Sequence, residues 1–490
     1  MDQSLDQIIA VRKDKLKRLR DRGINPYPST VNRTLPVSAF VEQFNSLKRS
    51  SKSVTLAGRL MAKREFGGLT FGLIKDGHGD VQIMFKKDDI GPKVYADLEL
   101  VDIGDIVQVT GSAMLTKKGE KTLLVKKLVL LAKSLRPLPD KWYGLTDQET
   151  RFRQRYLDLI FNPEVKERFL IRHHLVQAIR EFLLEQGYIE VDTPALQPMP
   201  GGALATPFTT YYEALGIDVY LRIAPELYLK RLIVGGFERV FEFARVFRNE
   251  GLSTQHLQDF TMLEFYQAYA DYRELMKLTE KMLSSVIKKV LGTTKVKFGD
   301  KTIDFKTPWP VKSFRDLILK ETDIDIDKCE TVEKLQTAIN SKKIHLTFKG
   351  KAGRGKLIDE LYKERVRPKL TNPMFLVDHP LDLSPLAKQK DDDSSKVQRF
   401  QLVVCGMEIV NAFSELNDPI DQAERFKEQA RQKKAGDKEA HSMDQDYIKA
   451  LEYGMPPTAG WGMGIDRLIA LLTNADSIRE AVLFPFVKSR

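Results

Sequence analysis

The sequence predicts an α+β protein of two or three domains, with a small β-barrel first and a larger domain of helices and antiparallel hairpins after it. Three observations support this prediction. A chain of 490 residues, 42% of them hydrophobic, exceeds what one small core needs. Short strand-like runs fill residues 54–131, and long amphipathic helices accompany paired strands from residue 163 onward.

The first expected element is an amphipathic helix over residues 3–22, with Leu5, Ile8, Ile9, Leu16 and Leu19 on its apolar side. No run here or later is apolar over the length that a signal peptide or a membrane span requires, so we expect a cytoplasmic protein with no membrane partner. Cys329 and Cys405 lie far apart in the sequence. They suggest neither a disulfide framework nor a metal site, which fits a reducing compartment.

Five strands are expected next, at residues 54–61, 69–76, 80–85, 105–111 and 122–131. Five short strands without long helices between them favour a Greek-key barrel of the oligonucleotide-binding (OB) kind. An SH3-like barrel and a plain sandwich fit the pattern nearly as well. The run "SLRPLPDKW" (134–142) is typical of a linker, so we expect the first domain to span residues 1–140 and the second 141–490.

Charge is concentrated in the leading part of the chain. Residues 1–150 hold 26 Lys and Arg against 18 Asp and Glu, a net charge of +8 out of +11 for the whole chain. This excess suggests a polyanionic partner, although a solvated charged surface explains it equally well. On the barrel, Phe71 and Gln82 are candidates to stack on and hydrogen-bond to a nucleotide base. The alternative is a packed core aromatic and an exposed strand glutamine.

The second domain carries charges inside sequence that otherwise reads as a buried sheet. After the expected helix at 163–186, "FRNEGLSTQHLQDFTMLEFYQAY" (247–269) contains a strand whose one face holds Phe260, Met262, Glu264 and Tyr266. Residues 399–418 read as a second hairpin around a Cys-Gly turn, with Asn411, Phe413 and Glu415 on one face. Buried charges are unfavourable unless they are paired or meet a ligand. Either Arg248 and these glutamates satisfy one another, or they await a charged ligand.

Three segments in order resemble the signature motifs of the class II aminoacyl-tRNA synthetases: "EQGYIEVDTPAL" (185–196), "FRNE" (247–250) with its following loop, and "GWGMGIDRL" (460–468). Further segments resemble the lysyl-tRNA synthetases of that family, among them "PGGALATPF" (200–208), "FTMLEFYQAYADY" (260–272) and "EIVNAFSELNDP" (408–419). The resemblance covers nearly the whole chain. It implies an N-terminal OB-fold anticodon-binding domain and an antiparallel-sheet catalytic domain flanked by helices.

The implied reaction joins lysine and ATP to lysyl-adenylate and then passes the lysyl group to the 3′ end of tRNA. The lysine carboxylate attacks the α-phosphorus directly, so the enzyme aligns the reactants and stabilises phosphate charge. By resemblance, Arg248 bridges the substrate carboxylate and the α-phosphate, and Arg467, with His256, holds the γ-phosphate. Glu250 reads the adenine amino group and Phe260 lies beneath the base.

For lysine, the resemblance implies an ε-ammonium site of Glu264, Tyr266 and Glu415, with Phe413 along the aliphatic stem. Glu226 and the Gly202 backbone would contact the α-amino group, and Asn411 the carboxylate. Mg²⁺ is expected with the ATP phosphates, with Glu408 and Glu415 as candidate ligands. Gln401 stands where the family usually has a glutamate ligand, so the number of ions held by protein is left open.

Other positions also depart from the family pattern, namely Thr206 for an arginine, Asp259 for a glutamate and Met84 for an aromatic residue on the OB sheet. Three alternative functions are compatible with the sequence. They are an aspartate or asparagine ligase of the same subgroup, an inactive or regulatory tRNA-binding paralogue, and a lysyl transferase that acts on a protein. The first of the three signature motifs implies a homodimer, with the helix and strand of residues 165–194 contributing to its interface. We interpret residues 285–395 as a helix-rich insertion.

Overall fold

The computed structural model describes residues 4–139, 147–203, 205–251, 253–254, 256–346, 353–384, 386–434 and 444–488. The chain divides into two compact units, residues 1–146 and 147–490. The predicted domain boundary at residues 140–141 lies outside the described residues. Within the described part, no helix has both the length and the apolar character needed to cross a lipid bilayer.

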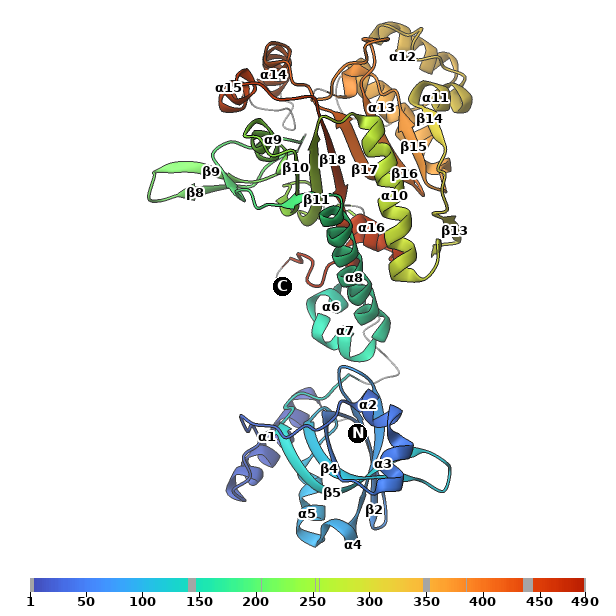
Figure 1. Cartoon of the computed structure of the whole chain (residues 1–490). Coiled ribbons are helices and arrows are strands. Elements are labelled where there is room, and N and C mark those ends of the chain that lie inside the picture. Colours follow the sequence, from blue (N-terminus) through green and yellow to red (C-terminus); the bar gives the residue numbers. More distant parts are fainter. Residues whose placement is uncertain are drawn as a thin grey trace. The chain divides into compact units, whose positions relative to one another are not determined.

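The first unit contains a closed five-stranded barrel in the order β1-β2-β3-β5-β4 (Figure 1). Its strands are β1 Val54–Phe66, β2 Leu69–Lys75, β3 Asp80–Lys86, β4 Ile106–Leu115 and β5 Lys121–Ala132. All neighbours pair antiparallel except β3 and β5, which are parallel. Burial alternates along β2, so that Thr70, Gly72 and Ile74 point into the barrel. The predicted barrel is confirmed.

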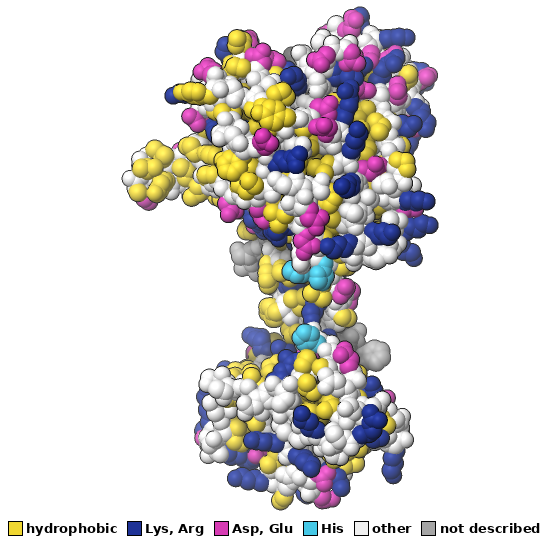
Figure 2. Space-filling model, in the orientation of Figure 1, with side chains coloured by type: hydrophobic (Ala, Val, Ile, Leu, Met, Phe, Trp, Pro, Cys, Tyr) yellow, Lys and Arg dark blue, Asp and Glu magenta, His cyan; other side chains and the backbone are white. Residues whose placement is uncertain are grey.

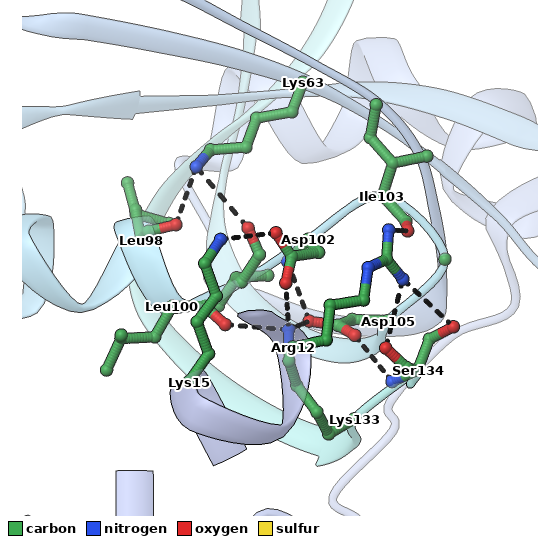
Figure 3. A network of polar contacts seen from close by, with 12 residues as sticks. Arg12, Lys15, Lys63, Leu98, Leu100, Asp102, Ile103, Asp105, Lys133 and Ser134 are labelled. Atoms are coloured by element: carbon green, nitrogen blue, oxygen red, sulfur yellow. Dashed lines mark hydrogen bonds and ion pairs between the residues drawn. The ribbon is translucent and has the colours of Figure 1, made fainter. Parts of the chain in front are cut away.

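Short helices surround this barrel: α1 Leu5–Asp21, α2 Val37–Glu42, α3 Phe44–Ser50, α4 Lys87–Ile90, α5 Pro92–Asp97 and η1 Leu98–Leu100. A polar network holds α1 in place (Figure 3). Arg12 donates to the carbonyls of Ile103, Ser134 and Arg136 at 3.0–3.1 Å. The buried Lys133 Nζ lies 2.6 Å from Asp102 and 2.8 Å from Asp105. Because each buried charge has a partner, this network fixes the helix to the barrel.

The second unit is built on an eight-stranded sheet in the order β14-β15-β16-β17-β18-β11-β10-β6 (Figure 1). These strands are β6 Ile189–Glu190, β10 Arg239–Phe247, β11 Asp259–Ala268, β14 Val311–Ser313, β15 Met374–Val377, β16 Arg399–Val404, β17 Met407–Ser414 and β18 Thr458–Gly464. The outer pairs β6–β10 and β14–β15 are parallel and the others antiparallel. The predicted α+β class with an antiparallel sheet is confirmed.

Both predicted hairpins are present. β10 and β11 pair from Arg239↔Gln267 to Phe247↔Asp259. β16 and β17 are joined by Cys405 and Gly406, whose φ angles are 49° and 69°. A two-residue turn with positive φ at both positions matches the twist of the strands that it connects.

Helices cover the two faces of the sheet differently. The three helices α8 Pro163–Glu185, α10 Tyr272–Leu291 and α16 Ile465–Leu472 bury one face, which carries Phe265 and Trp461. Near one end of the other face, α9 Glu226–Val234, α14 Pro419–Lys434 and α15 Gln445–Glu452 pack around Tyr266. The rest of this second face holds the candidate site.

The remaining elements are α6 Gln148–Arg153, α7 Arg155–Phe161, β7 Leu196–Gln197, β8 Thr209–Tyr212, β9 Ile217–Leu221 and η4 Ile478–Ala481. Between residues 292 and 398 lie β12 Lys295–Phe298, β13 Lys301–Asp304, α11 Phe314–Thr322, α12 Val332–Ser341, α13 Arg354–Arg365, η2 Arg367–Lys369 and η3 Leu381–Leu383. The helices α11–α13 pack with residues of β15 and β16 in a separate hydrophobic cluster. However, the same stretch supplies β14 and β15 to the main sheet, so a helix-rich insertion describes it only in part.

Candidate active site

The floor of the candidate site is formed by a strand, β18, that has three glycines on the site face. In β18, Ala459, Trp461 and Met463 point into the helix-covered core. The alternate positions are Gly460, Gly462 and Gly464, which lie opposite Tyr266, Glu264 and Met262 of β11. Successive residues of a strand face opposite sides, so the three glycines leave open space on the site face.

Position 460 requires glycine because the side chains of Glu415 and Tyr266 approach its backbone closely. A Cβ atom there would lie 2.1 Å from Glu415 Oε1 and 2.5 Å from Tyr266 Cε1. Neither group has room to withdraw, because both side chains are buried. The glycine therefore lets a carboxylate and a phenol meet above the sheet.

Three glutamates gather in this space. Glu226 begins α9, Glu264 lies in β11 and Glu415 follows β17, and all three are at most 7% exposed. Gly202, with φ of +85°, packs against Glu226, because its missing Cβ would lie 2.8 Å from that residue's Cβ. The structure thus brings together Gly202, Glu226, Glu264, Tyr266 and Glu415.

The cluster also contains Lys230 of α9, which the sequence did not identify as a site residue. Its fully buried Nζ lies 2.5 Å from Glu226 Oε1 and forms a second ion pair with Glu415. The ring of Phe413 lies 5.7 Å from the ammonium. Burial favours the neutral amine, but the two carboxylates outweigh it and raise the pKa of Lys230. The i,i+4 spacing of Glu226 and Lys230 was the available signal.

Glu264 has no ion pair among the described residues. Tyr266 Oη donates a hydrogen bond to its Oε2 at 3.2 Å. Burial, followed by repulsion from Glu226, raises the pKa of Glu264 to about 8. Burial also raises the pKa of Glu415 well above its ordinary range, despite Lys230. Lys230 alone therefore does not balance the acidic groups of this pocket.

Arginines line the adjoining part of the site. Arg248 Nε donates to the Ile223 carbonyl at 3.3 Å, and its guanidinium lies 5.2 Å from the centre of the Phe260 ring. Burial lowers the pKa of Arg248, and Glu250 and Glu264 counteract this. Arg467 donates to the Glu408 carbonyl at 2.5 Å. Arg467 also interacts electrostatically with Arg248, and two cations with an aromatic ring beside one of them suit a triphosphate with a base.

His256 is an exposed residue of the loop after β10, and its Nδ1 lies 2.8 Å from Ser253 Oγ. Partial desolvation, and then repulsion from Arg467, lower the pKa of its imidazole. The interactions with Arg467, Arg248 and Glu250 place His256 on the arginine side of the site.

Asn411 and Phe413 lie opposite Gly462 and Gly460 in the β17–β18 ladder, on the site face. Asn411 Oδ1 accepts a hydrogen bond from Arg399 Nε at 2.8 Å. Arg399, another residue that the sequence analysis missed, also donates to the Leu383 carbonyl and Ser384 Oγ. It therefore orients the Asn411 amide.

The metal pair of Glu408 and Glu415 stays a prediction. Glu408 lies near the start of β17 and Glu415 directly follows its end, so seven residues of strand, about 23 Å, separate their Cα atoms. Glu415 is paired with Lys230. Gln401 Nε2 donates to Glu408 Oε2 at 2.5 Å. Among the described residues, no group of three or more acidic, His or Cys side chains has the arrangement of a metal site.

In the barrel unit, Phe71 and Gln82 lie on the same outer face of β2 and β3, because Phe71 pairs with Met84 and Gln82 with Leu73. Both are partly exposed, and Gln82 Nε2 donates to Thr122 Oγ1 at 2.8 Å. The Phe66 ring lies 6.3 Å from that of Phe71. Phe71 is thus not a core aromatic.

Comparison with known proteins adds independent evidence. A model of the OB-fold nucleic acid binding domain matches residues 54–131. A protein named lysine–tRNA ligase from Pelotomaculum thermopropionicum is 49% identical over 489 residues, covering 100% of this chain and 96% of the relative. Proteins with the same name from Carboxydothermus hydrogenoformans and Bacillus subtilis are 47% and 45% identical, covering 100% of this chain and 99% and 98% of their own lengths.

The second unit matches a single family model over almost its whole length. The model describes class II tRNA synthetases (D, K and N) and spans residues 147–488. This range contains the glycine-floored pocket, the three glutamates and the arginines. The chain therefore belongs to the class II tRNA synthetase family.

Proposed function

We propose that this protein is a lysine–tRNA ligase, which joins L-lysine and ATP to lysyl-adenylate and pyrophosphate and then transfers the lysyl group to the 3′ end of its tRNA. The observation that carries the proposal is the pocket of three buried glutamates beside Arg248 and Arg467. The relatives named as lysine–tRNA ligases, which match the chain over its full length, support it.

The charges of this pocket match lysine. When Glu226, Glu264 and Glu415 are all ionised, Lys230 offsets one of them and two negative charges remain. Lysine carries two ammonium groups, which would balance these two charges, while Arg248 would pair with its carboxylate. Aspartate or asparagine would bring no second cation, so the ligases for those amino acids are disfavoured.

For the activation step, we assign Arg248 to bridge the lysine carboxylate and the α-phosphate, which reduces the repulsion between two anions. Phe260 would lie beneath the adenine and Glu250 would accept from its amino group. Arg467 and His256 would contact the γ-phosphate, and Asn411 the substrate carboxylate. No protein nucleophile is needed, because alignment and charge stabilisation are sufficient.

Mg²⁺ is proposed to enter with the ATP phosphates. Glu408 offers one carboxylate oxygen, whereas the neighbouring Gln401 directs its amide hydrogens at Glu408. Mg²⁺ usually keeps several waters and takes one or two carboxylates plus phosphate oxygens, which this donor set fits. The ion would supply charge neutralisation at the triphosphate.

The direct test is ATP–pyrophosphate exchange measured separately with each of the twenty amino acids, followed by aminoacylation of tRNA. We expect exchange with lysine alone and charging of one tRNA species. Exchange with aspartate or asparagine would favour another ligase of the subgroup. No exchange with any amino acid would favour a regulatory paralogue, and exchange without charging of any tRNA would favour transfer to a protein.

The barrel is proposed to bind the anticodon of the tRNA through Phe71 and Gln82. Replacing Phe71 with alanine is expected to lower kcat/KM for tRNA by about 10- to 100-fold, because base stacking on an aromatic contributes about 1–3 kcal/mol. Lysine-dependent exchange, which needs no tRNA, should be unchanged. As a control, the same change at the exposed Val31 of this unit should alter neither reaction. Equal charging by both variants would contradict the assignment.

A homodimer is proposed, supported by an exposed apolar hairpin. The β8–β9 hairpin carries Tyr211, Tyr212, Leu215 and Ile217, which are 42–64% exposed in the single chain. Figure 2 shows hydrophobic side chains gathered over this hairpin. Apolar patches of this kind mark contact surfaces, and a two-fold dimer would use the same patch twice. The reducing cytoplasm is the proposed location, in keeping with the two free cysteines.

Replacing Tyr212 and Leu215 together with aspartate is expected to convert the dimer into a monomer. Light scattering on purified protein should report twice the chain mass for the wild type and once the chain mass for the variant. Exchanging the exposed Lys297 and Lys306 for glutamine changes the net charge by the same −2 and is the matched control. A monomeric wild type would contradict the proposal.

A further inference from the structure

The first residues of β11 pair with β10 on one edge, but on the edge that faces β18 they are held by a side chain rather than by a strand. β18 ends at Gly464, opposite Met262, so Thr261 has no partner in β18. The Asp466 carboxylate takes that place, because Thr261 N donates to its Oδ2 at 2.7 Å. Asp466 is 0% exposed and lies in the first turn of α16.

Arg172 of α8 joins the same carboxylate to the same strand. Its guanidinium forms an ion pair with Asp466 and donates to Thr261 Oγ1 at 3.0 Å. Arg245 of β10 donates to that hydroxyl as well, at 2.9 Å. We call Arg172, Thr261 and Asp466 the Asp466 clamp. It connects α8, β11 and α16, three elements that are far apart in the sequence.

Two members of the clamp adjoin proposed ATP contacts. Phe260 precedes Thr261, and Arg467 follows Asp466. Any shift of β11 relative to α16 would therefore change the distance between the ring beneath the adenine and the arginine at the triphosphate. The lysine contacts Glu264 and Tyr266 lie farther along β11, where β18 still pairs with the strand.

We propose that Asp466 is a positioning residue that sets the spacing of Phe260 and Arg467 through the Asp466 clamp, and so governs the binding of ATP rather than of lysine. This inference rests on the proposed function, because it takes Phe260 and Arg467 as ATP contacts. Asp466 itself is enclosed by Thr261 and Arg172, so it acts through its neighbours.

The test compares KM for ATP and for lysine in the exchange reaction. Asp466→Asn keeps an oxygen for the Thr261 amide but loses the charge that faces Arg172. It should raise KM for ATP about 5- to 10-fold, whereas Asp466→Ala, which loses both contacts, should raise it about 50- to 100-fold. KM for lysine should stay within about threefold in both variants. Arg172→Gln should resemble Asp466→Asn.

Arg168→Gln is the matched control. Arg168 lies one turn earlier in α8 and forms the same kind of contacts, to Glu480 at 2.7 Å and to Thr473 Oγ1 at 3.1 Å, but none with β11. It should lower thermal stability about as much as Arg172→Gln while leaving KM for ATP unchanged. If Asp466→Ala does not fold, the KM values for ATP and lysine of Asp466→Asn and Arg172→Gln test the inference.

Two results would overturn the inference. Equal effects of Arg172→Gln and Arg168→Gln on KM for ATP would reveal a merely structural role, as would parallel increases in KM for ATP and lysine in Asp466→Asn. A wild-type protein without lysine-dependent exchange would instead contradict the proposed function.

Discussion

Replacing Glu264 with glutamine is expected to lower lysine-dependent ATP–pyrophosphate exchange by about a thousandfold, while the affinity for ATP changes by less than about threefold. Glu264 is the pocket carboxylate without an ion pair among the described residues, so it is the group best able to meet a substrate ammonium. An amide of the same shape cannot supply that charge. Exchange rates and calorimetric ATP binding check the two halves of the prediction.

The same substitution should stabilise the fold at alkaline pH. The pKa of Glu264 is raised from 4.5 to about 8 by burial, so the folded state binds a proton that the unfolded state has released. The contribution of this group to stability is full below pH 4.5 and is lost as pH rises through about 8. Glu264→Gln cannot ionise, and we expect it to exceed the wild type by about 1–2 kcal/mol at pH 8.5 in urea unfolding.

Glu242 provides the matched control, because it lies directly opposite Glu264 in the β10–β11 pair. Its carboxylate is already paired with Arg222 at 2.6 Å and accepts from Thr193 Oγ1 at 2.7 Å. Glu242→Gln should therefore destabilise the protein, since it leaves a buried guanidinium without its partner. If both variants lost stability equally, Glu264 would be an ordinary structural residue.

The affinity for lysine should also increase as pH rises. The substrate ammonium needs the ionised form of Glu264, and ionisation becomes complete only above pH 8. The affinity of the wild type for lysine is therefore expected to rise between pH 6 and 8. In Glu264→Gln this rise should be reduced.

The fold was predictable where local patterns decide it. The β10–β11 and β16–β17 hairpins follow from period-two alternation, and Gly406 fixed the position of the second turn. The strands β14 and β15 were not predicted, because they have three and four residues and form only by pairing with distant parts of the chain. Long-range pairing of this kind leaves little trace in a short stretch of sequence.

The site was predictable as a set of residue types but not as a set of contacts. Family resemblance identified the glutamates and arginines, yet Lys230 was missed because its partners Glu226 and Glu415 come from two separate elements. Gly460 is different, because the motif "GWGMGIDRL" (460–468) already contains the alternating glycines that leave the site face of β18 open.

Replacing Arg248 with lysine is expected to lower the rate of lysyl-adenylate formation by about a thousandfold with a much smaller change in KM for lysine. The planar guanidinium can donate to the substrate carboxylate and the α-phosphate at once, whereas an ammonium is a single point of charge on a different stem. Loss of one preorganised donor to developing phosphate charge lowers kcat by about 100- to 1000-fold. Single-turnover measurement of adenylate formation isolates this step from product release.

The control for Arg248→Lys is Arg180→Lys, because Arg180 also makes two parallel contacts, with Glu190 at 2.8 and 3.0 Å, but on the surface of the molecule. An exposed pair of this kind contributes little, so this variant should keep the wild-type rate within about twofold. If Arg248→Lys kept most of the wild-type rate while Glu264→Gln lost it, lysine would still be recognised as proposed. The bridge between the two anions would then have to come from another cation, and Arg467 or Mg²⁺ would be the next group to test.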